Sequence, residues 1–276
     1  SSKSRSATER AMSCGGCFEW LGGAQQRKSK PLGKIKLGYW GIRGLGAPLR
    51  MLLEYVGADY EDKHYSYLDE DEWFKKDKPE MLLKNPLANI PYLIEGDVVV
   101  CHTSSIFGYL ADRLDLGGDA TTNDIHVVRQ ALDEAYDLRN EIMRLVYLFM
   151  EACRDEQEFK QKMEEHLRVG YKKFYMKFEE LYKRSGGPYL LGASICVADF
   201  HLWEMLDQHE IYAAKASIPS PLSSAPQGTA EFEFISRFHK IFKALPQLKK
   251  YFRSRAYTLP CNMQGISWTS RVWGDC

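Results

Sequence analysis

The chain has 276 residues, of which 45% are hydrophobic, and its 37 basic residues balance 37 acidic ones. This length allows two ordinary domains or one large one, and the composition is that of a globular protein with a buried core. The balanced charge gives no reason to expect nucleic acid or an anionic membrane as a partner. No apolar run is long enough to span a bilayer.

Residues 1–33 are rich in serine, glycine and basic residues and lack the continuous apolar core of a secretory signal. We expect a flexible extension here, and the sequence leaves organellar targeting by it open. Cys14 and Cys17 have no second pair nearby, so no zinc site and no other metal is predicted. We expect no defined role for these two cysteines; the alternative is acylation, which would attach the tail to a membrane. The seven cysteines are irregularly spaced, which favours a reducing compartment, and we expect a cytoplasmic protein.

Residues 34–58 predict a strand followed by a helix. The apolar run Ile35–Leu37 indicates the strand. Pro48 suits the first turn of the helix because its missing N–H would be unpaired there in any case, and Gly57 is placed to end it.

Residues 59–116 continue this small α/β layer. Residues 59–67 alternate as an edge strand would, and residues 90–101 indicate a hairpin whose tight turn lies at 95–97. A helix is predicted to run to Leu114, with Thr103 and Ser104 as suitable N-cap residues.

After a break at residues 115–124 the pattern is helical. Residues 213–231 hold three prolines and many small residues, which indicates an exposed loop, and the tail is expected to be irregular. The predicted helical segments are 125–153, 158–184, 197–212 and 232–254.

The stretch Gly38–Gly41 places Tyr39 and Trp40 where the first strand turns toward the first helix. Aromatic residues at a strand end can simply pack the rim of a core. Such a corner also exposes helix N–H groups and the positive end of the helix dipole, and therefore suits an anionic sulfur.

Five segments carry a resemblance to a known family, in the order LGYWGIRGLGAPLRMLLEYVGADYE, NIPYLIEGD, HTSSIFGYLA, YLLGASICVADF and RVWGDC. They resemble the cytosolic glutathione transferases, closest to the mu class with some sigma-like proportions. The resemblance implies an α+β protein: a thioredoxin-like, glutathione-binding domain at 34–116 and an all-helical domain at 117–276 with a loop insertion near 213–231 and a C-terminal tail. It also implies a homodimer and a detoxifying transferase for small hydrophobic electrophiles.

The resemblance assigns Tyr39 to the sulfur of glutathione, the co-substrate. A free thiol is only about 3% ionised at pH 7, because its pKa is near 8.5. A phenol O–H that donates to the thiolate is worth roughly 1.5–3 kcal/mol and lowers that pKa by about one to two units. The other positions that the resemblance places around glutathione are Trp40, Trp73, Lys76 or Lys78, Asn89, Ile90, Pro91 (expected cis), His102 and Thr103.

Three features depart from the family pattern. His102 replaces the usual glutamine or glutamate, acidic residues replace the arginine before Trp73, and the loop preceding that tryptophan is short. The first two, together with the loop insertion near 213–231, favour one alternative, a non-catalytic binding or scaffold protein. The sigma-like proportions suggest a second alternative, a glutathione-dependent isomerase. The electrophile pocket is expected near Tyr147, Phe149 and Met150, which serve equally well as core residues.

Overall fold

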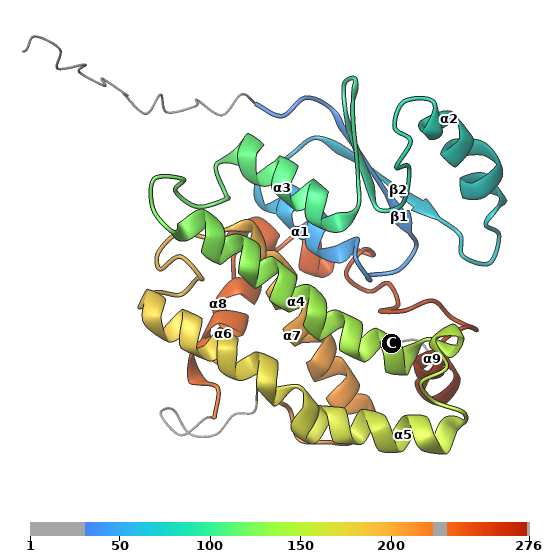
Figure 1. The fold of residues 1–276 in the computed structure, drawn as a ribbon, viewed down its shortest axis with the longest axis vertical. Coiled ribbons are helices and arrows are strands. Elements are labelled where there is room, and N and C mark those ends of the chain that lie inside the picture. The colour runs from blue at the N-terminus through green and yellow to red at the C-terminus, as the bar shows by residue number, and fades with distance from the viewer. Residues whose placement is uncertain (1–30, 223–230, 275–276) are drawn as a thin grey trace, which may run out of the picture.

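The computed structural model describes residues 31–222 and 231–274, so the predicted extension at 1–33 lies almost wholly outside them. A four-stranded sheet with its helices forms one end of the molecule, and a set of longer helices forms the other (Figure 1). In chain order the elements are β1 (Ile35–Trp40), α1 (Ala47–Tyr55), β2 (Tyr60–Tyr65), α2 (Lys78–Leu82), β3 (Tyr92–Glu95), β4 (Val98–Cys101), α3 (Thr103–Leu114), α4 (Asp124–Val146), α5 (Glu156–Glu165), α6 (Lys172–Ser185), α7 (Val197–Lys215), α8 (Glu233–Lys243) and α9 (Trp268–Trp273).

The sheet has the order β2-β1-β3-β4, with β1 and β2 parallel and the other pairs antiparallel. The predicted edge strand and hairpin are confirmed. The first strand continues beyond the predicted Ile35–Leu37 to Trp40, because Tyr39 and Trp40 keep pairing with β2. The thioredoxin-like α+β class is also confirmed.

The two faces of β1 explain its sequence. Ile35 and Leu37 lie in the main core with residues of α1 and α3, whereas Gly38 points to the opposite face. A Cβ atom on Gly38 would lie 2.2 Å from the ring of Tyr92, so only glycine lets that ring cross the strand.

One helical prediction in the first domain is wrong, and one helical segment was not predicted. Helix α3 begins at Thr103 with His102 as its N-cap, so Thr103 and Ser104 are not the capping residues. The charged stretch around Trp73 forms a π-helical segment, Glu72–Asp77, that leads into α2. Its charges lie on an exposed face, while Trp73 is buried and anchors the segment to the sheet.

Glu95, at the end of β3, links the sheet to α3. Its carboxylate accepts hydrogen bonds from Arg113 (2.6 Å), Tyr109 (2.5 Å) and the Gly33 N–H (2.7 Å). These donors, Arg113 first, lower the pKa of Glu95 from 4.5 to about 2.

We therefore expect Glu95→Gln to destabilise the protein at pH 7. A carboxyl group with a lowered folded-state pKa stabilises above its unfolded pKa and loses this contribution as the pH falls. The difference in unfolding free energy between wild type and Glu95→Gln should shrink between about pH 4.5 and pH 2. Urea unfolding at several pH values measures it, with the exposed Glu61→Gln as the control; a pH-independent difference would contradict the assignment.

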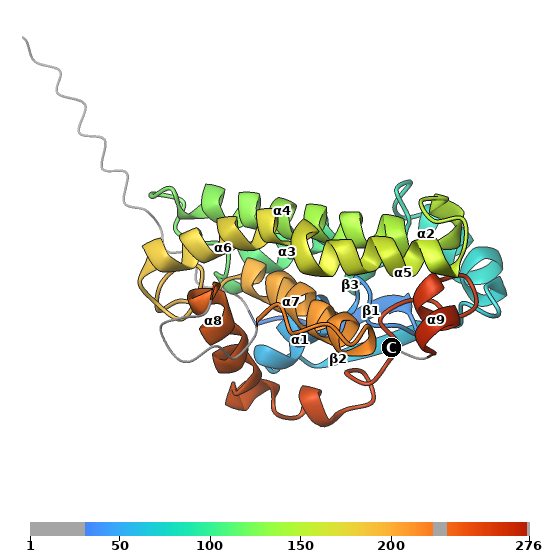
Figure 2. The ribbon, with the colours of Figure 1, turned by 90° about the horizontal axis from the view of Figure 1, so that it is seen from below.

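Helices α4, α5 and α6 lie along one side of the molecule, and α7 runs between them and the sheet unit (Figure 2). The long predicted helices are shorter than expected. The first ends at Val146, the second is divided by a π-helical segment at His166–Gly170, and the fourth ends at Lys243. The tail is not wholly irregular, since Ser267 caps α9.

The predicted loop at 213–231 is only partly tested, because residues 223–230 lie outside the described residues. Within the described part, Ile218 and Leu222 are buried, so this part is not the exposed loop that its composition predicts. No helix in the ranges 31–222 and 231–274 is both long and apolar enough to cross a membrane.

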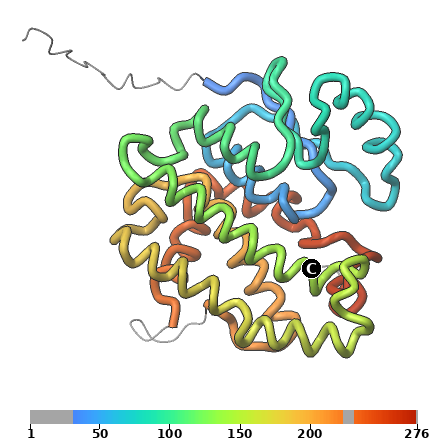
Figure 3. The backbone as a smooth tube through the Cα atoms, viewed as in Figure 1, coloured from blue at the N-terminus to red at the C-terminus, as the bar shows by residue number. Residues whose placement is uncertain are grey.

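The chain after α8 returns to the sheet. It passes between the first domain and the C-terminal end of α4 before reaching α9 (Figure 3). The Pro260 carbonyl accepts a hydrogen bond from the Arg43 N–H (2.7 Å), and the Cys261 carbonyl accepts one from the Gly44 N–H (3.2 Å). This C-terminal segment is thus held directly against the corner that follows Tyr39.

Candidate active site

Strand register brings the candidate residues to one edge of the sheet. Gly38 pairs with Tyr92, and Tyr92 pairs with Cys101. Because these pairs are antiparallel, the carboxyl ends of β1 and β4 meet the amino end of β3. Tyr39, Pro91 and His102 therefore lie at the same edge, next to the N-termini of α1 and α3.

The corner after Tyr39 is shaped by glycine. Gly44 has a positive φ of 39°, and a Cβ atom there would lie 2.9 Å from the Tyr39 hydroxyl oxygen. A Cβ atom on Gly46 would lie 2.7 Å from the same ring. The phenol thus rests against bare backbone, and its side chain is only 5% exposed. Within the described ranges, its hydroxyl has no hydrogen-bond partner.

Arg50 holds this corner from α1. Its guanidinium donates to the Ile42 carbonyl (2.8 Å) and is paired with Asp62 of β2 (3.0 Å). Since Arg50 is fully buried, it fixes the backbone between the first strand and the first helix from inside the core.

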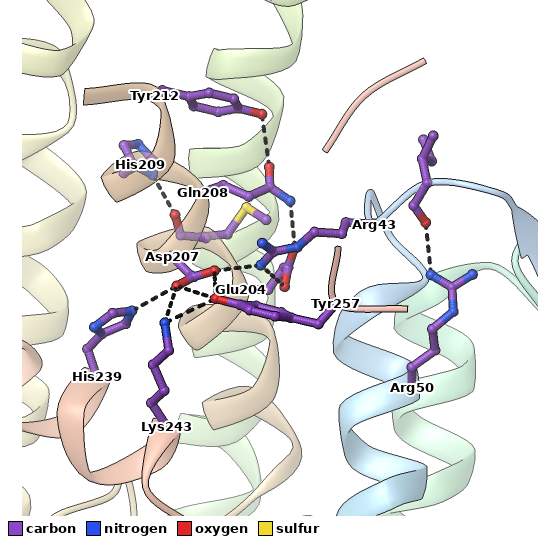
Figure 4. Close-up of polar contacts among 12 residues, drawn as sticks. Arg43, Arg50, Glu204, Asp207, Gln208, His209, Tyr212, His239, Lys243 and Tyr257 are labelled. Atoms are coloured by element: carbon purple, nitrogen blue, oxygen red, sulfur yellow. Dashed lines mark hydrogen bonds and ion pairs between the residues drawn. The ribbon is translucent and has the colours of Figure 1, made fainter. Parts of the chain in front are cut away.

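Arg43 holds the corner from the helical side. Its guanidinium donates to both carboxylate oxygens of Glu204 (2.9 and 2.8 Å) and to Asp207 (2.8 Å), both on α7 (Figure 4). Tyr257 lies beneath the guanidinium at 4.8 Å and donates to Asp207 (3.2 Å). Burial alone would lower the pKa of Arg43, but the neighbouring carboxylates raise it well above its usual value. This cluster was not predicted from the sequence, in which its only signal is the arginine inside the apolar GIRGLG corner.

Tyr147 approaches the corner from the helical domain. It follows the last residue of α4, and its hydroxyl accepts the Met263 N–H at 3.5 Å. Burial, together with the nearby Tyr39, raises the pKa of Tyr147 to about 12, so it stays a neutral phenol. Phe149 and Met150 are exposed instead, which places them outside the core.

The two predicted tryptophans lie on the α2 side of the sheet and share Tyr65 as a neighbour. Trp40 packs against Tyr65 edge-on at 6.4 Å, and Trp73 lies 5.2 Å from the same ring. Trp73 also stacks on Tyr92 at 5.9 Å. Neither indole N–H has a hydrogen-bond partner in the part of the chain that the structure describes.

The two candidate lysines differ in their surroundings. Lys76 is exposed, whereas Lys78 is half-buried with its ammonium 5.4 Å from the centre of the Phe74 ring. Lys76 belongs to the π-helical segment that carries Trp73, and Lys78 is the first residue of α2, which follows directly. Both lysines therefore lie within five residues of Trp73 in the sequence.

The remaining candidates surround the Ile90–Pro91 bond, which is cis as the resemblance implies. Asn89 is exposed and its side chain accepts from the Ile90 N–H (2.9 Å). The His102 N–H donates to the Pro91 carbonyl (3.0 Å), and His102 has a positive φ of 69°. Thr103 is buried and its hydroxyl oxygen has no hydrogen-bond partner among the described residues.

Two cavities are described, and neither is lined by Tyr39. One of about 180 Å³ lies on the α2 face of the sheet beside Tyr92 and Met81. The other, of about 420 Å³, lies between α4 and α5 beside His166. The glutathione site expected at the Tyr39 corner therefore stays a prediction.

Comparison with known proteins places this geometry in a family. The N-terminal domain model of glutathione S-transferases matches residues 35–112, and their C-terminal domain model matches residues 136–255. The class-mu 26 kDa isozyme 1 of Fasciola hepatica is 32% identical over 240 residues, which span 86% of this chain and 91% of that relative. The chain belongs to the glutathione S-transferase family.

Other glutathione S-transferases agree with this placement. Glutathione S-transferase Mu 1 of Oryctolagus cuniculus is 29% identical over 243 residues, or 85% of this chain and 98% of that protein. A solved pi-class glutathione S-transferase of Onchocerca volvulus has a TM-score of 0.65 at 24% identity, covering 83% of this chain and 97% of that one, and this likeness supports the fold alone. The predicted family and its mu-class leaning are therefore confirmed.

Proposed function

We propose that this glutathione S-transferase conjugates the thiolate of glutathione to electrophilic carbons of small hydrophobic molecules, a detoxifying activity, with glutathione as co-substrate. The observation that carries this function is the Tyr39 hydroxyl. It lies beside Gly44, with Gly46 against the ring, at the strand-to-helix corner, and it has no hydrogen-bond partner in residues 31–222 and 231–274. The side chain is largely buried, but the hydroxyl oxygen is not among the fully covered atoms that lack a partner, so its O–H can donate to an external acceptor.

The chemistry needs only that donor. The bound thiol loses its proton to solvent, and the phenol O–H donates to the resulting thiolate and stabilises it by about 1.5–3 kcal/mol. The thiolate then attacks the electrophilic carbon, forms the carbon–sulfur bond and displaces the leaving group with its electron pair. Tyr39 itself keeps its proton throughout.

The first domain, 34–116, is proposed to hold the tripeptide. Thr103, at the start of α3, supplies an unpaired buried hydroxyl for the γ-glutamyl carboxylate, where the helix dipole also favours an anion. Asn89, Ile90, Pro91 and His102 border this point. Trp40, Trp73 and either Lys76 or Lys78 are proposed to hold the remainder, with the Trp73 indole N–H as a donor to the glycine carboxylate.

The helical domain, 117–276, is proposed to supply the electrophile side. Tyr147 and Met263 lie near the corner, and their contact joins the end of α4 to the C-terminal segment. Phe149 and Met150 are proposed as further substrate contacts at the exposed end of this region.

The direct test is conjugation of glutathione to 1-chloro-2,4-dinitrobenzene, followed by mass analysis of the product. The proposal requires an enzyme-dependent thioether. Binding of glutathione without any thioether would indicate a scaffold protein, and a rearranged substrate without a thioether would indicate an isomerase.

The unpaired hydroxyl of Thr103 leads to a prediction in which the effect on stability differs from the effect on glutathione binding. Thr103→Val keeps the shape but removes a buried polar group without a partner, so the unfolding free energy of the free protein should stay within about 1 kcal/mol of wild type or rise. The KM for glutathione should increase about tenfold because the γ-glutamyl carboxylate loses a donor. Chemical denaturation and glutathione kinetics measure the two effects. An unchanged KM would remove Thr103 from the site.

We also propose a homodimer, as the resemblance implies. Leu83 is 88% exposed and Leu87 is 69% exposed, and both follow α2 on the outside of the first domain. Such apolar residues favour burial against a second copy. Sedimentation should give twice the 31.8 kDa mass of one chain.

The cytoplasmic location of the protein remains a prediction. The distribution of the tagged full chain in cells tests it.

A further inference from the structure

One charged residue interrupts the inward face of α4. Leu132, Arg139 and Val146 are spaced by seven residues, or about two helical turns, and so share one side of the helix. Leu132 and Val146 are buried, and Arg139 between them is half-buried. A cation on a core-facing side is normally paired with a carboxylate.

Arg139 has no such partner among the described residues. The described residues place no carboxylate within ion-pair distance of it, and its only contacts of this kind are a long hydrogen bond to Asn140 (3.5 Å) and the Tyr136 ring at 6.0 Å. Glu134 and Glu141 of the same helix pair with lysines of α6 instead, Lys177 and Lys173 respectively.

The neighbouring helix does not supply an anion either. His201 of α7 lies between Phe107 and Tyr136, and its buried Nε2 has no hydrogen-bond partner among the described residues. Burial first, and then the charge of Arg139, lower the pKa of His201 to about 3, so the imidazole is neutral. His201 therefore supplies no negative charge to Arg139.

Arg139 lies on the helix that leads to the proposed site. Tyr147 lies eight residues after Arg139, about 12 Å further along the chain of α4 by its Cα atom. Its phenol interacts electrostatically with both Tyr39 and Arg139. Consider an electrophile whose reacting carbon lies next to the glutathione sulfur at Tyr39. If its far end extends along α4, that end approaches the guanidinium of Arg139.

We propose that the electrophile of this enzyme carries an anionic group, a carboxylate in the first instance, which Arg139 binds. A guanidinium can hold a carboxylate through two parallel hydrogen bonds, which gives orientation as well as affinity. This inference rests on the proposed function and adds a class of substrate to it.

A matched pair of electrophiles tests the proposal. The substrates are 4-chloro-3,5-dinitrobenzoate and 4-chloro-3,5-dinitrobenzamide, which react alike: the glutathione sulfur bonds to the ring carbon and chloride leaves with its electron pair. They differ in charge at the far end of the ring. The measured quantity is the ratio of kcat/KM for the carboxylate to that for the carboxamide.

We expect Arg139→Met to lower this ratio about tenfold or more, since a charge-assisted hydrogen bond is lost. Arg139→Lys should fall between Arg139→Met and wild type. Arg144→Met is the matched control, because Arg144 is an exposed arginine of the same helix, and it should leave the ratio unchanged. Circular dichroism confirms that each variant is folded.

Three results would overturn the inference. An unchanged ratio with both compounds still conjugated would reject the anion site and leave the proposed function standing. A raised KM for glutathione with an unchanged ratio would mean that Arg139 binds the tripeptide. If wild type conjugates neither compound, the proposed function fails, and calorimetry with the two glutathione thioethers decides instead: equal affinities would reject the anion site.

Discussion

Replacing Tyr39 by phenylalanine should lower kcat/KM for conjugation by about 10–100-fold. The substitution removes one hydrogen bond to the thiolate, worth roughly 1.5–3 kcal/mol, and leaves the ring in place. Because Gly44 and Gly46 pack against the ring itself, the corner should keep its shape. Steady-state kinetics with saturating glutathione measures the loss.

The same experiment separates chemistry from folding. The loss should decrease as the pH rises toward the pKa of the free thiol, where glutathione ionises without help. Tyr109→Phe is the control, because Tyr109 is a hydrogen-bonded tyrosine of α3 that contacts Glu95 and not the corner. An unchanged rate for Tyr39→Phe, or an equal loss for Tyr109→Phe, would contradict the role given to Tyr39.

Replacing Arg43 by methionine should destabilise the protein by about 3–5 kcal/mol. The substitution leaves Glu204 and Asp207 buried on α7 without their main cation, and breaking a buried ion pair from one side is strongly unfavourable. Since the same residue ties the Tyr39 corner to α7, folded Arg43→Met protein should also lose activity. Urea unfolding of the two proteins at pH 7 measures the first effect.

Lys243→Met provides the comparison for this cluster. Lys243 lies 3.7 Å from the same Asp207 but is half-exposed, so its loss should change the unfolding free energy by less than about 1 kcal/mol. Similar values for Arg43→Met and Lys243→Met would mean that the buried cluster does not hold the two domains together.

Much of the fold could be predicted because local signals agreed with it. The proline and glycine around α1, the turn at Gly96 and the alternation of β2 each act within a few residues. The predicted helix lengths were wrong where contacts with residues distant in sequence determine where a helix ends. The helix ending at Val146 stops because Tyr147 pairs with Ser267 of the C-terminal segment, more than a hundred residues away.

In the candidate site, too, the features that depend on local sequence could be predicted and those that depend on distant residues could not. Tyr39 and the cis bond at Pro91 follow from motifs that can be found in the sequence. The cap at α3 could not be predicted from residue type, because His102 has a positive φ and leaves the better capping residue, Thr103, inside the helix. Arg43 and Arg139 also escaped prediction, since the presence or absence of a carboxylate partner depends on α7, which is distant in sequence.

The most direct measurement is the ultraviolet difference spectrum of glutathione bound at neutral pH, recorded for wild type and for Tyr39→Phe. We predict a thiolate band with the wild-type protein and its loss with the variant at equal occupancy of glutathione. Bands of equal strength in both proteins, or no band with wild type despite binding, would contradict the role of the Tyr39 hydroxyl in ionising the sulfur.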